Sequence, residues 1–334
     1  MLEQLRRRVL IGLALGILVV GVIFVLADGG ALLDAFGQFD WRLTVPVLLL
    51  VLLNYALRFL KWQYYLRLSG VEGLDRRSSA LIFLSGFSMA MTPGKVGEFL
   101  KSYFVRVRTS TPLTRTVPVV AAERVTDAAG ILVLAGVGLL AFRSGWPAFL
   151  AIAGLMALAL VLLQRESFVE RLLGLLGRVG FVRRRMDSLR DLYHSSRMLL
   201  GPRPLAVALS LSTLSWFWEC VAFFLILVGL DIEPSWQLLL AATFVFSASA
   251  WLGGASMLPG GLGATEASAA ALLVLTVDDP AMTGTVAAAA TLLLRFATLW
   301  FGVFIGIIAL WIVARWEPVG EPVRGGEQPE IAAG

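Results

Sequence analysis

Residues 85–101 read SGFSMAMTPGKVGEFLK, and this stretch decides how the chain is expected to fold. An apolar segment that begins near residue 79 is interrupted at Pro93-Gly94 and is followed by charged residues. Proline lacks the N–H that a helix needs, and glycine permits positive φ angles, so a helix cannot continue here. In a bilayer such a break survives only where protein buries it or where it lines a wet cavity. The stretch therefore predicts a broken hairpin, provided that the surrounding chain lies in a membrane.

The composition places the chain in a membrane. Its 334 residues are 58% hydrophobic and 15% charged, and the mean hydropathy is +0.83. A soluble domain of this length would need more charge on its surface. Apolar runs long enough to span a bilayer recur along the chain. We expect an all-α polytopic membrane protein of about 6–8 transmembrane helices plus two broken or re-entrant hairpins, in one transmembrane domain over residues 1–315.

Charge and residue counts exclude several classes of function. The net charge is +5, but the basic residues lie in short loops beside apolar spans, which favours topology over nucleic-acid binding. The single cysteine (Cys220) and single histidine (His194) disfavour a disulfide, a metal site or a catalytic triad. The sequence contains no Walker A and no GxSxG pattern, which disfavours ATP hydrolysis and esterase chemistry. We therefore expect neither a metal nor a cofactor.

The loops predict which side of the membrane each span faces. Arginines precede a first span at about 9–26, and nine arginines lie in the loop 164–203, so both belong in the cytoplasm. In that loop, apolar residues from Phe168 recur at helical spacing. They predict either an amphipathic helix on the anionic inner leaflet or an ordinary loop helix packed on the membrane domain. We expect an inner-membrane protein with cytoplasmic termini and a disordered tail over 316–334. Further spans are expected near 43–60, 116–141, 147–163, 204–229 and 284–314.

A second break reads PGGLGATE at residues 259–266 and follows an apolar segment over 236–257. In each half, a span with unusual polar residues precedes the broken hairpin and a charged span follows it. The first hairpin has basic flanks and the second has acidic flanks, so the two are expected to enter from opposite sides. This pattern predicts an inverted repeat, over about 43–141 and 204–314. Secondary transporters of this architecture bind substrate between the repeats near the midplane.

Ionisable groups within the spans define the candidate substrate site, because each costs about 3 kcal/mol in a bilayer. A half-helix that begins at a Pro-Gly break can offer free N–H groups to a phosphate. Arg124 or Arg295 could pair with Glu98 or Glu266 across the repeat interface until a lipid phosphate displaces the carboxylates. Alternatively, the breaks are only kinks and the charges are fixed ion pairs. The candidate substrate-binding residues are Pro93, Gly94, Gly97, Glu98, Lys101, Glu123, Arg124, Asp127, Pro259, Gly260, Gly261, Gly263, Glu266 and Arg295.

At these positions the chain resembles the flippase-like transmembrane region of lysylphosphatidylglycerol synthases and its stand-alone relatives. The likeness rests on Pro93-Gly94-x-x-Gly97-Glu98 with Lys101, Glu123-Arg124-x-x-Asp127, Pro259-Gly260-Gly261-x-Gly263-x-x-Glu266 and Arg295. It extends over roughly residues 10–315. The resemblance implies a bacterial or archaeal inner-membrane protein that moves an amphiphilic lipid between leaflets. A soluble aminoacyl-transferase domain follows the membrane part of the synthases. Here only a short tail follows, so lipid aminoacylation is not expected.

Three functions remain open from the sequence. The first is a flippase or transporter of an anionic phospholipid or polyprenyl-linked lipid, with a separate lipid-modifying enzyme as a candidate partner. In it, Lys101, Arg124 and Arg295 hold the phosphate, and the acids serve as counter-charges or a proton relay. The second is a membrane-embedded transferase acting on a lipid phosphate. The third is a passive ion pathway.

Overall fold

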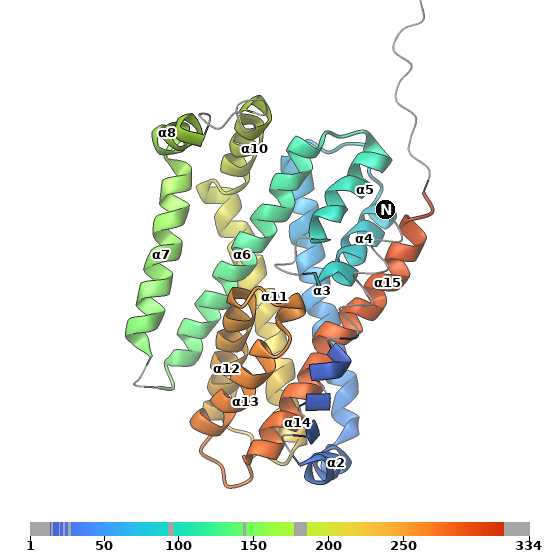
Figure 1. Cartoon of the computed structure of the whole chain (residues 1–334), viewed down its shortest axis with the longest axis vertical. Helices are drawn as coiled ribbons and strands as arrows, with labels where there is room; N and C mark the ends of the chain where they lie inside the picture. Colours follow the sequence, from blue (N-terminus) through green and yellow to red (C-terminus); the bar gives the residue numbers. More distant parts are fainter. Residues whose placement is uncertain are drawn as a thin grey trace, which may run out of the picture.

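A computed structural model describes residues 28–92, 97–142, 145–176 and 186–316, together with residues 14, 16–19, 21, 22, 24 and 25. Every regular element in these residues is a helix (Figure 1). The described positions between 14 and 25 are helical, but most of the expected first span lies outside the described residues. The expected disordered tail lies outside them too, apart from residue 316.

Long helices run through the molecule (Figure 1). They are α3 (Thr44–Leu68), α6 (Leu113–Leu139), α7 (Trp146–Gln164), α11 (Pro202–Gly229), and α14 (Gly284–Arg295) with α15 (Phe301–Val313), which the π-helix η5 (Phe296–Trp300) joins. The expected spans at these places are confirmed as helices, although α3 runs eight residues beyond the predicted end at residue 60.

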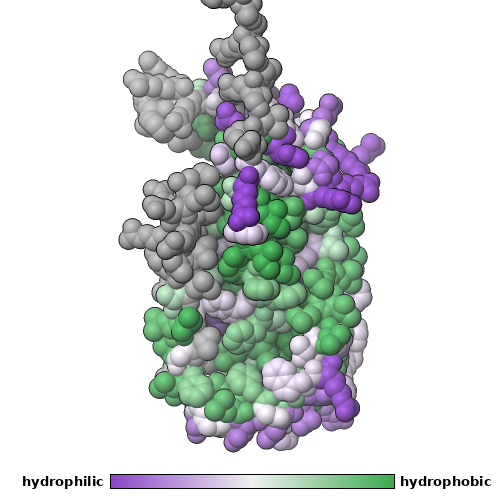
Figure 2. Space-filling view, turned by 90° about the vertical axis from the view of Figure 1, so that its right-hand side faces the viewer, coloured by the Kyte–Doolittle hydropathy of each residue, from purple (hydrophilic) through white to green (hydrophobic). Residues whose placement is uncertain are grey.

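Within the part of the chain that the structure describes, five helical stretches are long and apolar enough to cross a membrane: Trp41–Leu68, Trp146–Gln164, Pro202–Gly229, Trp236–Ala255 and Gly284–Val313. Helix α6 is comparably long, at 27 residues, but carries three charged residues near its middle. Figure 2 shows hydrophobic side chains over the middle of one face and hydrophilic side chains toward its two ends. The protein is therefore a multi-pass helical membrane protein.

Two helical hairpins occupy opposite halves of the molecule. Hairpin 1 comprises α4 (Arg76–Ser85), the 3-10 helix η2 (Gly86–Met89) and α5 (Leu100–Thr109). Hairpin 2 comprises α12 (Trp236–Ala255), the 3-10 helix η4 (Pro259–Gly261) and α13 (Ala264–Thr276). In Figure 1, hairpin 1 lies in the upper half and hairpin 2 in the lower half, so they open in opposite directions.

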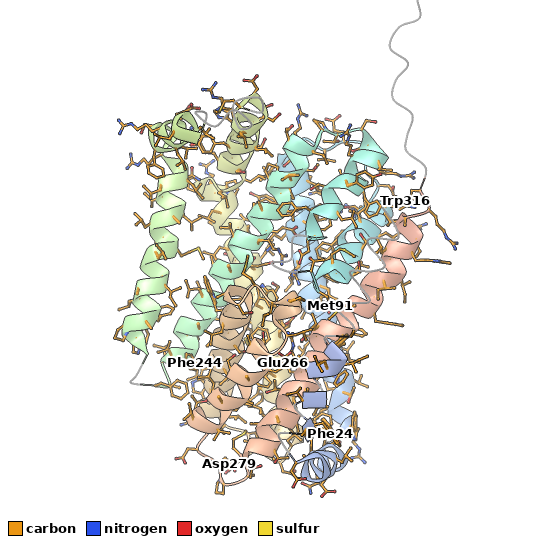
Figure 3. The ribbon with its side chains drawn as sticks, in the orientation of Figure 1. Phe24, Met91, Phe244, Glu266, Asp279 and Trp316 are labelled. Atoms are coloured by element: carbon orange, nitrogen blue, oxygen red, sulfur yellow. The ribbon has the colours of Figure 1, made fainter. Side chains whose placement is uncertain are left out.

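The turns of the two hairpins meet inside the molecule. Met91 from hairpin 1 and Leu262 from hairpin 2 belong to one buried hydrophobic cluster with Val303 of α15. Figure 3 shows Met91 and Glu266, which lie near these turns, close together at mid-height. Interruption of the second apolar segment at 259–261 is confirmed, whereas Pro93, Gly94, Lys95 and Val96 lie outside the described residues.

Local chemistry explains where the hairpins begin and how they pack. Asp75 and Ser235 cap α4 and α12, each accepting a hydrogen bond at 3.0 Å from a backbone N–H, of Ser78 and Leu238 respectively. Hydrogen bonds from Ser78 also lower the pKa of the Asp75 carboxyl. Near the turn of hairpin 1, Gly306 of α15 packs closely against η2. A Cβ added at Gly306 would lie 2.3 Å from the backbone nitrogen of Ser88.

The basic loop 164–203 forms two further helices, α8 (Glu166–Leu176) and α10 (Met186–Leu199), and residues 177–185 lie outside the described residues. The predicted helix in this loop is therefore confirmed. Val169, Leu173 and Tyr193 hold α8 against α10, and α10 packs on α6. Helix α8 also exposes the apolar side chains of Phe168, Leu172 and Leu175. Contact of that face with the inner leaflet stays a prediction.

Candidate functional site

A polar stripe on α3 forms one wall of the interior. Asn54, Arg58 and Lys61 are spaced by four and three residues, so they share one face of the helix. All three are buried, and Lys61 is fully buried. The Asn54 side chain donates a hydrogen bond to the Ser215 carbonyl of α11 at 2.9 Å. The stripe therefore faces the protein interior and not the lipid.

Asp127 of α6 is the centre at which these charges converge. One carboxylate oxygen pairs with Lys61 Nζ and accepts a hydrogen bond from Ser212 Oγ at 3.1 Å. The other oxygen is 2.9 Å from Arg124 Nη2 and 3.7 Å from Arg58 Nη2. One acid thus faces three cations, which come from α3 and from its own helix.

Arg124 connects this centre to hairpin 1. Its guanidinium lies 3.4 Å from the carboxylate of Glu98, which is in the turn of the hairpin. The Arg124 side chain keeps 24% of its surface exposed. Arg58 is held differently, with its guanidinium over the rings of Phe87 and Trp216 at 5.2 and 5.1 Å from their centroids. Such faces attract a cation and leave its N–H groups free to point elsewhere.

Arg295 connects α14 to hairpin 2 in a corresponding way. Its Nε donates to Glu266 at 2.5 Å, and its Nη2 donates to the Gly260 carbonyl at 2.6 Å. The second oxygen of Glu266 accepts a hydrogen bond from the N–H of Gly263 at 2.7 Å, which caps α13. Gly260, Gly261 and Gly263 all have positive φ angles, which the turn requires. Each arginine is therefore paired with an acid at the turn of the hairpin in its own half of the chain.

Several of these groups line one cavity of about 490 Å³ between the hairpins, α3, α6, α11 and the α14–α15 segment. Its volume lies in the range of small-molecule sites. Among the described residues, the charged ones that line it are Arg58, Glu98, Arg124, Asp127, Glu219 and Arg295, so three arginines balance three carboxylates there. Met257 and Leu258 of hairpin 2 also line the cavity and are 65% and 46% exposed, so the cavity reaches the surface between apolar side chains.

Lys101 and Glu123 form a separate buried pair. Their side chains are 2.6 Å apart, and the Lys101 ammonium also lies 4.6 Å from the centroid of the Trp62 ring. Neither residue lines the cavity. The structure thus pairs Lys101 with Glu123, but it places this pair outside the cavity that most of the other predicted charged residues line.

The remaining predicted site residues divide into three groups. Glu98, Arg124, Asp127, Gly260, Gly261 and Arg295 line the cavity. Gly97, Pro259, Gly263 and Glu266 support the hairpin turns without lining it, and Gly97 donates a hydrogen bond to Thr92 Oγ1 at 2.8 Å. Pro93 and Gly94 lie outside the described residues. The arginines and acids do pair, but each pair lies within one half of the chain and not across the two halves.

Arg58, Lys61 and Glu219 are not among the substrate-binding residues predicted from the sequence, although Arg58 and Glu219 are among the unusual polar residues of the spans that precede the hairpins. The span predicted near 43–60 ends just before Lys61, whereas the helix continues to Leu68. The shared helix face of Asn54, Arg58 and Lys61 was the signal that could have found it. Glu219 lies on α11, which packs against α3, and it also lines the cavity.

Comparison with known proteins identifies the family to which the chain belongs. No curated protein matches the chain significantly. A family model for the transmembrane region of lysylphosphatidylglycerol synthases matches residues 9–306, which is most of the chain. The protein therefore belongs to the lysylphosphatidylglycerol synthase transmembrane-region family.

Proposed function

We propose that the protein moves an anionic amphiphile, a phospholipid or a polyprenyl-linked lipid, across the inner membrane, with the head group passing through the cavity between the hairpins. One observation carries this proposal. Arg124 and Arg295 line the same cavity, and each is tied to the turn of a different hairpin. Guanidinium groups bind phosphate through paired hydrogen bonds, so two of them in one membrane cavity suit a phosphate head group.

The charges of the described lining residues balance, and this balance supports exchange with a ligand. Arg124 Nε and Asp127 Oδ2 are buried and, among the described residues, have no hydrogen-bond partner of good geometry. A phosphate oxygen could accept from Arg124 and from Arg58, which share Asp127 Oδ2 at 2.9 and 3.7 Å. Lys61 and Ser212 would keep the other oxygen of Asp127 in place. The phosphate thus would replace a resting contact without leaving Asp127 unpaired.

The surface opening suits an amphiphile. Met257 and Leu258 are apolar, exposed and part of the cavity wall. A lipid could leave its acyl chains in the bilayer beside these residues while its head group enters between the hairpins. A free inorganic ion would gain no binding free energy from an opening lined by apolar side chains.

In this proposal the hairpins re-enter the membrane from opposite sides, as the two halves of an inverted repeat over about 43–141 and 204–314. Hairpin 1 and the basic loop 164–203 would face the cytoplasm, with both termini on that side. The opposite directions of the hairpins in Figure 1 support this arrangement. Because the turns share a cluster at Met91, Leu262 and Val303, they would have to separate before a head group could cross.

The test is lipid transfer by the purified protein in vesicles. A fluorescent phosphatidylglycerol in the inner leaflet becomes extractable by external albumin only after it crosses. We expect transfer with the wild-type protein and a loss of at least about tenfold for Arg124→Ala and Arg295→Ala, because each removes a charge-assisted contact worth at least about 1.4 kcal/mol.

Arg190→Ala is the matched control, since Arg190 forms an exposed ion pair with Glu170 at 3.3 Å and neither residue lines the cavity. It should transfer lipid at the wild-type rate. Equal transfer by all four proteins, or none by the wild type for any anionic lipid tried, would contradict the proposal.

A further inference from the structure

A second cavity, of about 350 Å³, lies on the outside of the helical body. We call it the aromatic groove. It is formed by the beginning of α3, the C-terminal part of α11 and the segment around η5. Its wall includes Thr44, Leu48, Ile226, Phe296, Trp300 and Phe304. Thr44 contributes the one aliphatic hydroxyl among the described lining residues, and the remaining lining is aliphatic or aromatic.

The groove is separate from the charged cavity, although both use the same helical segment. Arg295, Thr298 and Gly302 face the charged cavity. Phe296, Trp300 and Phe304 face the groove. These two sets alternate along the segment, so η5 is a wall with one cavity on each side. The described linings of the two cavities have no residue in common.

One polar group in the groove points to the ligand. Thr44 Oγ1 is buried and has no hydrogen-bond partner among the described residues. Leaving a buried hydroxyl unpaired is costly, and a carbonyl oxygen from a ligand would satisfy it. Trp41, which also lines the groove, is 58% exposed and begins the span Trp41–Leu68, where the aromatic belt of a membrane protein lies. The groove thus has one end at the membrane interface and apolar walls beyond it.

We propose that the aromatic groove binds one acyl chain of a membrane phospholipid, with the ester carbonyl of that chain accepting a hydrogen bond from Thr44 Oγ1. The ester region of a phospholipid lies just below the head groups, at the level that Trp41 marks, and its chain continues into the apolar layer. A soluble metabolite would not fit these walls. This site is independent of the proposed transport.

Photocrosslinking tests the proposal in nanodiscs that contain the full chain. The probe is a phosphatidylglycerol with a diazirine on one acyl chain, and mass spectrometry locates the labelled peptides. We expect labelling of the peptide that contains residues 293–304. Leu48→Trp should fill the groove and abolish this labelling. Leu49→Trp is the matched control, because Leu49 is 60% exposed and does not line the groove, and it should label like the wild type.

Thr44→Val tests the polar contact. Loss of one neutral hydrogen bond should weaken competition by unlabelled phospholipid by about 2–10-fold. Gly16 packs against Trp300, so the described N-terminal residues adjoin the groove, but none of them is among its lining residues. No labelling of 293–304, or labelling that survives Leu48→Trp, would overturn the proposal. Labelling should persist in Arg124→Ala and Arg295→Ala, although both substitutions are expected to reduce lipid transfer. Failure of the groove proposal can therefore be distinguished from failure of the transport proposal.

Discussion

Asp127 is the residue on which the interior charges depend. It faces Arg58, Lys61 and Arg124, and Lys61 is completely buried. Breaking a buried ion pair by removing one partner is expensive, because the other charge is left in a medium of low dielectric constant. Apolar replacement of both partners avoids that cost.

We therefore expect Asp127→Leu to destabilise the protein by about 3–5 kcal/mol. Lys61→Met combined with Asp127→Leu should be more stable than Asp127→Leu alone. Unfolding in mixed micelles measures both, and Asp191→Ala on the exposed face of α10 is a control that should change little. Strictly additive effects of the two substitutions would show that Lys61 and Asp127 are not coupled.

Glu123 and Arg124 are neighbours in sequence with different expected roles. Glu123 pairs with Lys101 away from the cavity, whereas Arg124 lines it. We expect Lys101→Met with Glu123→Gln to lower thermal stability but to keep lipid transfer within about twofold of wild type per folded protein, because no cavity charge changes. Loss of transfer equal to that of Arg124→Ala would place this pair in the transport path.

The site residues differ in how well sequence could predict them. Arg124 and Arg295 stand out because each is a charge inside a long apolar run. Lys61 does not stand out, because it follows Arg58 near the end of an apolar run and resembles a cytoplasmic flank. The pairing of Lys101 with Glu123 depends on how α5 packs on α6, and spacing along the chain does not contain that information.

At the scale of the elements, close helix packing depends on particular glycines. A Cβ at Gly306 would lie 2.3 Å from the backbone nitrogen of Ser88, so α15 and η2 touch at backbone level. A Cβ at Gly154 of α7 would meet nothing within 4 Å. Small residues commonly permit such approach between membrane helices.

Gly306→Ala should therefore lower the melting temperature and loosen hairpin 1 against α15. Gly154→Ala should leave the melting temperature unchanged or raise it, because alanine favours a helix by about 1 kcal/mol over glycine. Thermal unfolding in detergent compares the two. Equal effects would mean that the contact of α15 with η2 is not tight.

The helices themselves were largely predictable from hydrophobic runs and Pro-Gly breaks, as α7 and the break at η4 show. The π-helix η5 was not, because its residues, Phe296–Trp300, are as apolar as the helices on either side. The π-helix begins directly after Arg295, and its wider turn changes which side chains of the segment face each of the two cavities. Such π-turns within α-helices are frequent at functional sites.

At the scale of the whole molecule, the opposite directions of the hairpins imply opposite exposure of their loops. Glu72 precedes hairpin 1, and Asp278 follows hairpin 2; both are exposed. In a Cys220→Ala background, we expect cysteines at these positions to react with an impermeant maleimide from opposite sides of the membrane. Reaction of both from the same side would refute the inverted arrangement. The sequence predicted this inversion only from the charges that flank the breaks, because the two halves share few residues.

A cross-link between the turns of hairpin 1 and hairpin 2 tests most directly whether the lipid head group passes between the two hairpins. Met91→Cys and Leu262→Cys, in the Cys220→Ala background, place thiols within one buried cluster of the turns. A cleavable bifunctional methanethiosulfonate would join them, and albumin extraction would follow lipid transfer in vesicles. We predict that the cross-linked protein stops transferring lipid and that reduction restores transfer. Undiminished transfer by the fully cross-linked protein would contradict passage of the head group between the hairpins.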